Sequence, residues 1–144
     1  MSYTVDANVL LYASDESSPL HATARAIVGR LADGPEIAYV FWPTIFAYLR
    51  IATHPAIFAR PLTIGEAVGN IDQLLGRPHV RIAGEGEGFW RSFRAVADDA
   101  LPSGNLVPDA HLAALMLENE VRTILTRDRD FRRFPRVEVR DPFA

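Results

Sequence analysis

The stretch YTVDANVLL at residues 3–11 places one acidic residue, Asp6, inside an otherwise apolar run. Tyr3-Thr4-Val5 begins like a short buried strand, and the apolar character continues past the carboxylate through Val9-Leu10-Leu11. A carboxylate in such a setting is costly to bury unless it is paired or bound to a metal. Because no local helix cap or turn accounts for Asp6, we favour a functional role for it.

Outward from this stretch, strand and helix signals alternate along the chain. Strands are predicted at residues 37–41, 79–82, 121–126 and 137–139, the last of them an edge strand. Helices are predicted to start at Ser17-Ser18-Pro19, at Pro43-Thr44, and at residues 63, 89 and 110. This alternation is typical of an α/β fold in which helices flank a mainly parallel central sheet, an α/β/α sandwich. No repeat or linker divides residues 1–144, so we expect a single domain.

The helix predicted over residues 63–75 has a clear start and a clear apolar face. Thr63 and Glu66 have the spacing of a capping box, in which each side chain accepts a hydrogen bond from the other residue's backbone N–H. Six apolar residues follow with a helical period, and we expect them to be buried on one face: Ile64, Ala67, Val68, Ile71, Leu74 and Leu75.

Composition restricts the classes of function. The 144 residues are 49% hydrophobic and 23% charged, which is globular composition and excludes a disordered tail or a coiled coil. The chain has no cysteine, so thiolate zinc sites, cysteine nucleophiles and disulfides are excluded. No apolar run approaches the ~20 residues of a membrane span, and the N-terminus lacks the pattern of a signal peptide. We therefore expect a cytoplasmic protein with no membrane partner.

Three carboxylates map to places where strands end or helices begin. Asp6 follows the first strand, Asp109 lies near the start of the alanine-rich helix, and Asp128 follows the strand that contains Leu125. In a parallel sheet such positions meet at one edge. Converging carboxylates repel one another, and a hard divalent cation such as Mg²⁺ or Mn²⁺ relieves that repulsion.

Each of these acids also has a structural interpretation. Asp109 at a helix N-terminus is favourable for the helix dipole without any function. Asp128 and Asp130 are also compatible with a simple turn before Phe131. The functional interpretation therefore depends on the coincidence of the sites and not on any one of them.

Every cation in the chain is an arginine, and seven of the 15 arginines follow position 121. Arginine can bind a phosphate through two parallel hydrogen bonds, which lysine cannot do. The net charge of −3 provides no overall attraction for nucleic acid. The C-terminal arginines are compatible with either a solvated surface or a phosphate-binding face.

Four motifs, at residues 5–12 (VDANVLLY), 49–55 (LRIATHP), 104–115 (GNLVPDAHLAAL) and 125–131 (LTRDRDF), together resemble the VapC-type PIN-domain ribonuclease toxins. The resemblance extends over essentially the whole chain and implies one PIN-like domain over residues 1–144. It implies a Mg²⁺-dependent endoribonuclease that cleaves structured RNA, such as transfer or ribosomal RNA. It also implies a cognate VapB-type antitoxin that holds the enzyme inactive.

The resemblance assigns roles to individual residues. Asp6 and Asp109 would be the principal metal ligands, and Asp128 would complete the catalytic site. Asp130 is a candidate to support that site, and Thr126 and Asn105 are candidates to orient a carboxylate or a bound water. Candidate RNA-binding residues are Arg127, Arg129, Arg132, Arg133 and Arg50. His111, two residues after Asp109 on a helix, points in a different direction, and we expect it to pack or to form a hydrogen bond.

One position departs from the family pattern. The stretch that commonly reads Ala-Glu-Leu-Arg is here Ala47-Tyr48-Leu49-Arg50, and no Asp or Glu occurs between residues 37 and 63. If Tyr48 faces the acids, the site has three carboxylates instead of four. This keeps open an alternative in which the chain is a degenerate PIN module that binds RNA or a partner without cleaving. A phosphatase with Asp6 as nucleophile is a weaker alternative, because no second acid follows two residues later.

Two aromatic pairs, Phe41-Trp42 and Phe89-Trp90, raise the question of partner surfaces. Such pairs are compatible with a homodimer, an antitoxin groove or the core of the domain. We expect a homodimer.

Overall fold

Five parallel strands form the central sheet, in the order β3-β2-β1-β4-β5. The computed structural model describes all 144 residues. The strands are β1 (Ser2–Val5), β2 (Ile37–Phe41), β3 (Val80–Ala83), β4 (Thr123–Leu125) and β5 (Glu138–Arg140). The predicted parallel α/β fold is confirmed, and each strand predicted beyond residue 11 is present.

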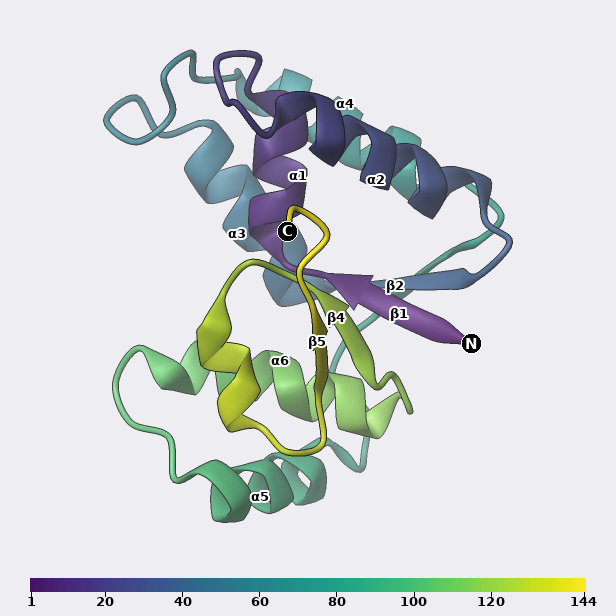
Figure 1. The fold of residues 1–144 in the computed structure, drawn as a ribbon, viewed down its shortest axis with the longest axis vertical. Coiled ribbons are helices and arrows are strands. Elements are labelled where there is room, and N and C mark those ends of the chain that lie inside the picture. Colours follow the sequence, from purple (N-terminus) through teal and green to yellow (C-terminus); the bar gives the residue numbers. More distant parts are fainter.

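Six helices and one 3₁₀ helix cover the two faces of this sheet (Figure 1). One face carries α1 (Ala7–Ser14), α2 (His21–Asp33), α3 (Trp42–Ala52) and α4 (Ile64–Leu75). The other carries α5 (Phe89–Ala100), α6 (Leu106–Glu118) and the 3₁₀ helix η1 (Arg129–Arg133). Each face has its own cluster of buried apolar side chains, as a three-layer sandwich requires. None of the helices has the length and apolar character to cross a membrane.

Residues 7–14 form helix α1 directly after the first strand, with Asp6 at the N-cap position, so the apolar run at 7–11 belongs to a helix and not to the strand. The strand ends because the carbonyl of Asp6 accepts the first helical hydrogen bond, from the N–H of Val9 at 3.1 Å. Four residues of α1 are buried, namely Ala7, Val9, Leu10 and Leu11. A short helix that is buried on several sides has no polar face, so its apolar run cannot be told from a buried strand by periodicity.

Helix α2 begins at His21, later than the predicted start at Ser17-Ser18-Pro19. The Ser18 hydroxyl accepts the N–H of Leu20 at 3.1 Å, two residues along the chain. This bond stabilises a turn that precedes the helix, because a serine side chain competes for local backbone donors. The helix packs on the core through Ala24, Ile27 and Leu31, which are buried.

Helix α4 has the predicted capping box. The Thr63 hydroxyl accepts the N–H of Glu66 at 3.1 Å, and the Glu66 carboxylate accepts the N–H of Thr63 at 2.9 Å. The predicted burial is wrong at two positions, since Ile64 and Val68 are 61% and 41% exposed. The core beneath α4 is narrower than the apolar stripe in the sequence.

Helix α6 begins at Leu106, four residues before the predicted start, so Asp109 lies in its first turn. Its central residues are almost completely buried, which confirms the strong helix signal in the sequence: Ala110, Leu112, Ala113, Ala114, Leu115 and Met116. Because α6 packs tightly into the second core, the position of Asp109 relative to the sheet is well defined.

Tyr48 is buried in the core and does not face the acids, contrary to the possibility considered from the sequence. Its hydroxyl lies 2.7 Å from the Ser14 hydroxyl at the end of α1 and accepts a hydrogen bond from the Asn70 amide of α4 at 3.0 Å. Ser14 lies eight residues after Asp6, which corresponds to about 12 Å along a helix. Tyr48 therefore connects α3 to α1 and α4. Its side chain does not reach the edge of the sheet where the acids lie.

We predict that Tyr48→Phe lowers the free energy of unfolding by about 1–2 kcal/mol, because Ser14 and Asn70 then lose a buried hydrogen-bonding partner. Urea unfolding monitored by circular dichroism measures the change. Tyr12→Phe is the matched control, since the Tyr12 hydroxyl forms no hydrogen bond within the chain and its ring packs edge-on against Phe143. Equal midpoints for the two variants would contradict a structural role for the Tyr48 hydroxyl.

Candidate functional site

Asp6 stands at the carboxyl end of β1, the central strand. Its backbone N–H donates to the carbonyl of Leu125, the last residue of β4, at 3.1 Å. Its Oδ2 accepts a hydrogen bond from the Thr126 hydroxyl at 2.9 Å. Because Thr126 is fully buried, this bond holds the carboxylate in one direction beside the end of β4.

Thr126 also connects Asp6 to a second acid. The backbone N–H of Asp128 donates to the Thr126 hydroxyl oxygen at 2.9 Å. The Asp128 carboxylate in turn accepts the N–H of Asp130 at 2.9 Å, which starts the 3₁₀ helix η1. The turn role considered for Asp128 is therefore real, and the same turn brings the two acids that follow β4 to the carboxyl edge of the sheet.

Asp109 approaches these acids from the first turn of α6. One carboxylate oxygen each from Asp109, Asp128 and Asp130 lies within 4.8 Å of the other two. Asp6 is outside this tight group but close enough for its charge to raise the pKa of Asp109. Four acids thus converge from three places in the chain: the end of β1, the start of α6 and the segment after β4.

The electrostatics of the site disfavour the charged carboxylates. Burial raises the pKa of Asp6, the Thr126 hydrogen bond opposes this shift, and the charge of Asp128 adds to it. Burial, followed by the charges of Asp128, Asp6 and Asp130, raises the pKa of Asp109 from 3.8 to about 6. Carboxylates held together against desolvation and mutual repulsion are typical of a functional site.

The donor set suits a hard divalent cation. All four candidate ligands are carboxylates, with no sulfur or imidazole among them, and oxygen ligands are those that Mg²⁺ and Mn²⁺ prefer. A cation would also offset the repulsion that raises the pKa of Asp109. The group of Asp109, Asp128 and Asp130, with Asp6 beside it, therefore has the chemistry of a divalent-metal site.

The side chains of three residues considered for this site form no hydrogen bond with the acids in the structure: Asn105, Arg50 and Tyr48. Asn105 is exposed at the N-terminal boundary of α6, and its side chain makes no hydrogen bond to the helix. Arg50 is exposed in the last turn of α3. It lies about 12 Å along the helix from Trp42, the residue that follows the carboxyl end of β2. Tyr48 is in the core between helices, as described above.

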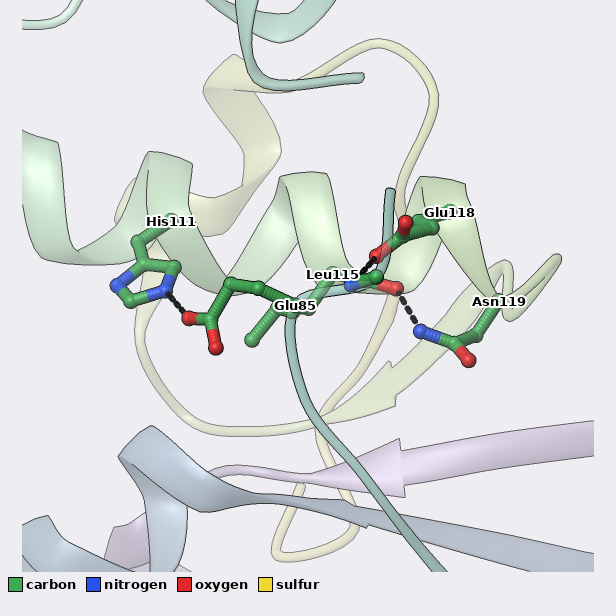
Figure 2. A network of polar contacts seen from close by, with 6 residues as sticks. Glu85, His111, Leu115, Glu118 and Asn119 are labelled. Atoms are coloured by element: carbon green, nitrogen blue, oxygen red, sulfur yellow. Dashed lines mark hydrogen bonds and ion pairs between the residues drawn. The ribbon is translucent and has the colours of Figure 1, made fainter. Parts of the chain in front are cut away.

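His111 forms a hydrogen bond, as expected, and its partner is Glu85 in the loop between β3 and α5 (Figure 2). The same loop is attached to α6 a second time, where the N–H of Gly86 donates to Glu118 at 3.0 Å. A Cβ at Gly86 would lie 2.8 Å from the Glu118 carboxylate, so a larger residue there would displace this side chain from its bond with the loop. The glycine-rich sequence GEGEG at 84–88 is the only local signal for this attachment, and the sequence analysis did not identify it.

Six of the seven arginines after position 121 fall into two groups. Arg136 and Arg140 form ion pairs with Asp99 and Glu138. Four arginines on or next to η1 are exposed and take part in no ion pair: Arg127, Arg129, Arg132 and Arg133. Because η1 begins directly after Asp128, these four flank the acidic group.

A separate groove of about 630 Å³ lies on the other half of the molecule. It is bounded by α1, α2 and α4, and half of its lining residues are apolar. Tyr48 and Ser14 contribute to it, and its charged or imidazole side chains are Glu16, His21, Arg25 and Arg77. None of the four acids lines this groove.

Comparisons with known proteins agree with this geometry. The family model described as PIN domain matches residues 3–137. Ribonuclease VapC48 of Mycobacterium tuberculosis is 49% identical over 144 residues, which cover 100% of this chain and 99% of the relative. Ribonuclease VapC43 of the same organism is 37% identical over 138 residues, 96% of this chain and 93% of the relative.

Solved structures of low sequence identity share the fold. VapBC2 from Rickettsia felis, bound to a fragment of its promoter DNA, superposes with a TM-score of 0.70 at 14% identity, over 97% of this chain and 98% of that chain. The sarcin-ricin loop cleaving toxin VapC20 of M. tuberculosis gives a TM-score of 0.63 at 14% identity, over 90% and 92%. With the match to the whole domain and the close relatives, the chain belongs to the PIN-domain family, among the VapC-type ribonuclease toxins.

Proposed function

We propose that this protein is a Mg²⁺-dependent endoribonuclease that cleaves structured RNA, with Asp6, Asp109 and Asp128 as its metal ligands. The convergence of these acids and Asp130 at one edge of the sheet carries the proposal. Mn²⁺ has similar ligand preferences and is expected to substitute. When bound, the cation supplies a Lewis acid that activates water and offsets charge on the phosphodiester.

The side chains of the protein prepare the site for this chemistry. Thr126 donates to Asp6 and accepts from the N–H of Asp128, so it sets the separation of the two acids. Asp128 is further restrained by its hydrogen bond with the N–H of Asp130. Such orienting contacts hold ligands in place before the cation arrives. Asp130 is exposed, which suits a supporting role at the rim of the site.

Phosphate binding is assigned to the exposed arginines that flank the acids. Arg127 and Arg129 lie on either side of Asp128 in the sequence, and Arg132 and Arg133 follow within η1. Each guanidinium can donate two parallel hydrogen bonds to one phosphate. The nature of the substrate is supported by VapC20, which is described as cleaving the sarcin-ricin loop. Arg50 is kept as a more distant candidate for RNA contact.

A VapB-type antitoxin is proposed as the inhibitory partner. The groove between α1, α2 and α4 is a candidate surface for it, since it is half apolar and carries Arg25 and Arg77 at its rim. An apolar segment with acidic flanks would complement this surface. The homodimer expected from the sequence remains a prediction. Trp42 is 44% exposed and Trp90 is 66% exposed, whereas Phe41 is fully buried and Phe89 is half-buried.

The alternative of a non-catalytic PIN module is less well supported. It depended on the missing glutamate at position 48, but Tyr48 belongs to the core and not to the acidic edge. The four acids remain close together without it. RNA binding without cleavage by the pure protein in Mg²⁺ would favour this alternative.

We predict that Mg²⁺ raises the melting temperature of the wild-type protein and that Asp6→Asn or Asp109→Asn abolishes both this effect and RNA cleavage. At 100 times the dissociation constant, a ligand specific for the folded state stabilises it by about 2.7 kcal/mol. Differential scanning fluorimetry and cleavage of total RNA measure the two effects. Asp72→Asn, on the exposed part of α4, is the matched control and should behave as wild type. Cleavage that persists in EDTA would contradict a metal mechanism.

We predict that, without metal, the contribution of Asp109 to stability falls as pH rises from about 4 to 6. The folded protein holds the Asp109 proton more tightly than the unfolded chain, because its pKa is raised from 3.8 to about 6. Loss of this proton therefore destabilises the folded state. Metal affinity should change in the opposite direction and rise with pH, since the ligand must be ionised. Urea unfolding between pH 4 and 7 should show a steeper fall of stability with pH in the wild type than in Asp109→Asn, because Asp6, whose pKa is also raised, contributes to the slope of both proteins.

We predict that changing Arg127 and Arg129, or Arg132 and Arg133, to glutamine weakens RNA binding and flattens its salt dependence. For single-stranded RNA, the slope of log K against log salt falls by ~0.7 for each phosphate that the protein no longer neutralises. Fluorescence anisotropy at several salt concentrations measures it. Changing Arg25 and Arg30 on α2 provides a control with the same loss of charge. If the control pair alters the slope as much as the other two pairs do, the effect reflects net charge and not a phosphate-binding face.

A further inference from the structure

Trp90 is an exposed aromatic side chain that the proposed function has not used. It lies in the first turn of α5 and is 66% exposed. One face of the indole stacks on the Phe93 ring, with ring centroids 5.5 Å apart and planes at 15°. Because Phe93 covers one face while most of the side chain stays exposed, the opposite face is open to solvent.

Trp90 is connected to the acidic site by packed aromatic rings. Its partner Phe93 lies 6.3 Å from Phe89 between centroids. Phe89 packs edge-to-face on His111, 5.3 Å away, and His111 is two residues after Asp109 on α6. The exposed indole thus lies at the outer end of a row of rings that begins at His111 on α6, the helix that also carries Asp109.

The loop that precedes α5 is attached firmly to α6, which fixes this row in position. Figure 2 shows the Glu85 carboxylate turned toward the His111 ring and the Glu118 carboxylate bonded to the backbone of the loop. The two attachments are on the same helix that carries Asp109. Trp90, four residues after Gly86, therefore lies at the start of a helix whose preceding loop is bonded to α6.

Two arginines accompany Trp90 along the outer surface of α5. Arg91 and Arg94 line a shallow hollow of about 820 Å³ together with Trp90. Both are exposed, and neither takes part in any ion pair. Glu87 and Asp98 also line the hollow, so its formal charge is balanced. The guanidinium groups nevertheless remain free to bind an anion.

We propose that Trp90, Arg91 and Arg94 form a subsite for one nucleotide of the RNA substrate. A base stacks on the open face of the indole, and the adjacent phosphates pair with the two guanidinium groups. This inference rests on the proposed ribonuclease function, and it extends the RNA path from the acids across α6 to α5. Single-stranded RNA in loops is recognised in this way, by aromatic stacking of unpaired bases.

The combination of groups favours RNA over a protein partner. Here an open indole face is flanked by two arginines without an ion-pair partner, on a helix that packs against the helix carrying Asp109. Arginine and tryptophan together match the phosphate and the base of one nucleotide.

Tryptophan fluorescence tests the proposal directly, because the chain has only two tryptophans. In a Trp42→Phe variant, Trp90 is the only indole, and a base that stacks on it should quench its emission. The probe is an RNA stem-loop with an unpaired purine-rich loop, and each variant also carries Asp6→Asn to prevent cleavage. In the reciprocal Trp90→Phe variant, the emission of Trp42 should stay unchanged.

Binding and cleavage measurements separate stacking from charge. Trp90→Ala should raise the Kd for the stem-loop roughly tenfold, since stacking contributes substantially to binding for each base. Trp90→Phe should restore most of the affinity because a phenyl ring also stacks. Arg91→Gln with Arg94→Gln should flatten the salt dependence by ~0.7 for each phosphate that the variant leaves unpaired. Trp42→Ala, which removes another exposed indole, is the matched control and should bind RNA as wild type does.

Several outcomes would overturn the subsite. Wild-type cleavage of total RNA with equal affinities for Trp90→Ala and Trp42→Ala would exclude it while leaving the ribonuclease function intact. A Trp90→Ala protein that changes from dimer to monomer in sedimentation, with unchanged RNA affinity as a monomer, would assign this surface to a second copy. A Trp90→Ala protein that loses antitoxin binding but keeps its RNA affinity would assign this surface to the antitoxin. A wild-type protein that neither binds nor cleaves RNA would overturn the proposed function itself.

Discussion

The parallel pairing of β1 with β4 is the constraint on which the site depends. Val5 lies beside Leu125 in this pairing, so Asp6 and Thr126, 120 residues apart in the chain, emerge together at the same edge of the sheet. The N–H of Asp6 continues the ladder by donating to Leu125, and the Thr126 hydroxyl then bonds the Asp6 carboxylate. A shift of one residue in this register would turn one of these side chains to the opposite face of the sheet.

The fold keeps its acids together at a cost to its own stability. Burial and mutual repulsion raise the pKa values of Asp6 and Asp109, which means that both charged carboxylates are less favourable here than in water. No arginine forms an ion pair with either of them. The nearby arginines remain exposed around η1, where they can meet a phosphate without neutralising the acids. The repulsion between these carboxylates is therefore not offset by an ion pair within the protein, and a bound cation is expected to offset it.

The two faces of the sheet have different roles. On one face, Tyr48 is a core residue at the position where the family commonly has a carboxylate. Its hydroxyl is hydrogen-bonded to α1 and α4 beside the half-apolar groove. On the other face, α6 carries Asp109 and also anchors the loop that positions α5 (Figure 2). Two halves of one small domain can therefore serve a partner and a substrate separately, because each half has its own core.

The sequence by itself determined the alternation of strands and helices, the capping box of α4 and the position of Asp6 directly after the first strand, because these depend on local spacing. Tertiary structure decided the rest. Packing made residues 7–14 a helix and left Ile64 and Val68 exposed. It also buried Phe41 and partly buried Phe89, while the tryptophans that follow them stayed exposed. Only the strand register could bring Thr126 to Asp6, and only the turn at η1 could place Asp130 beside Asp109. These contacts join residues that are far apart in the chain, and such separations leave no periodic pattern in a sequence.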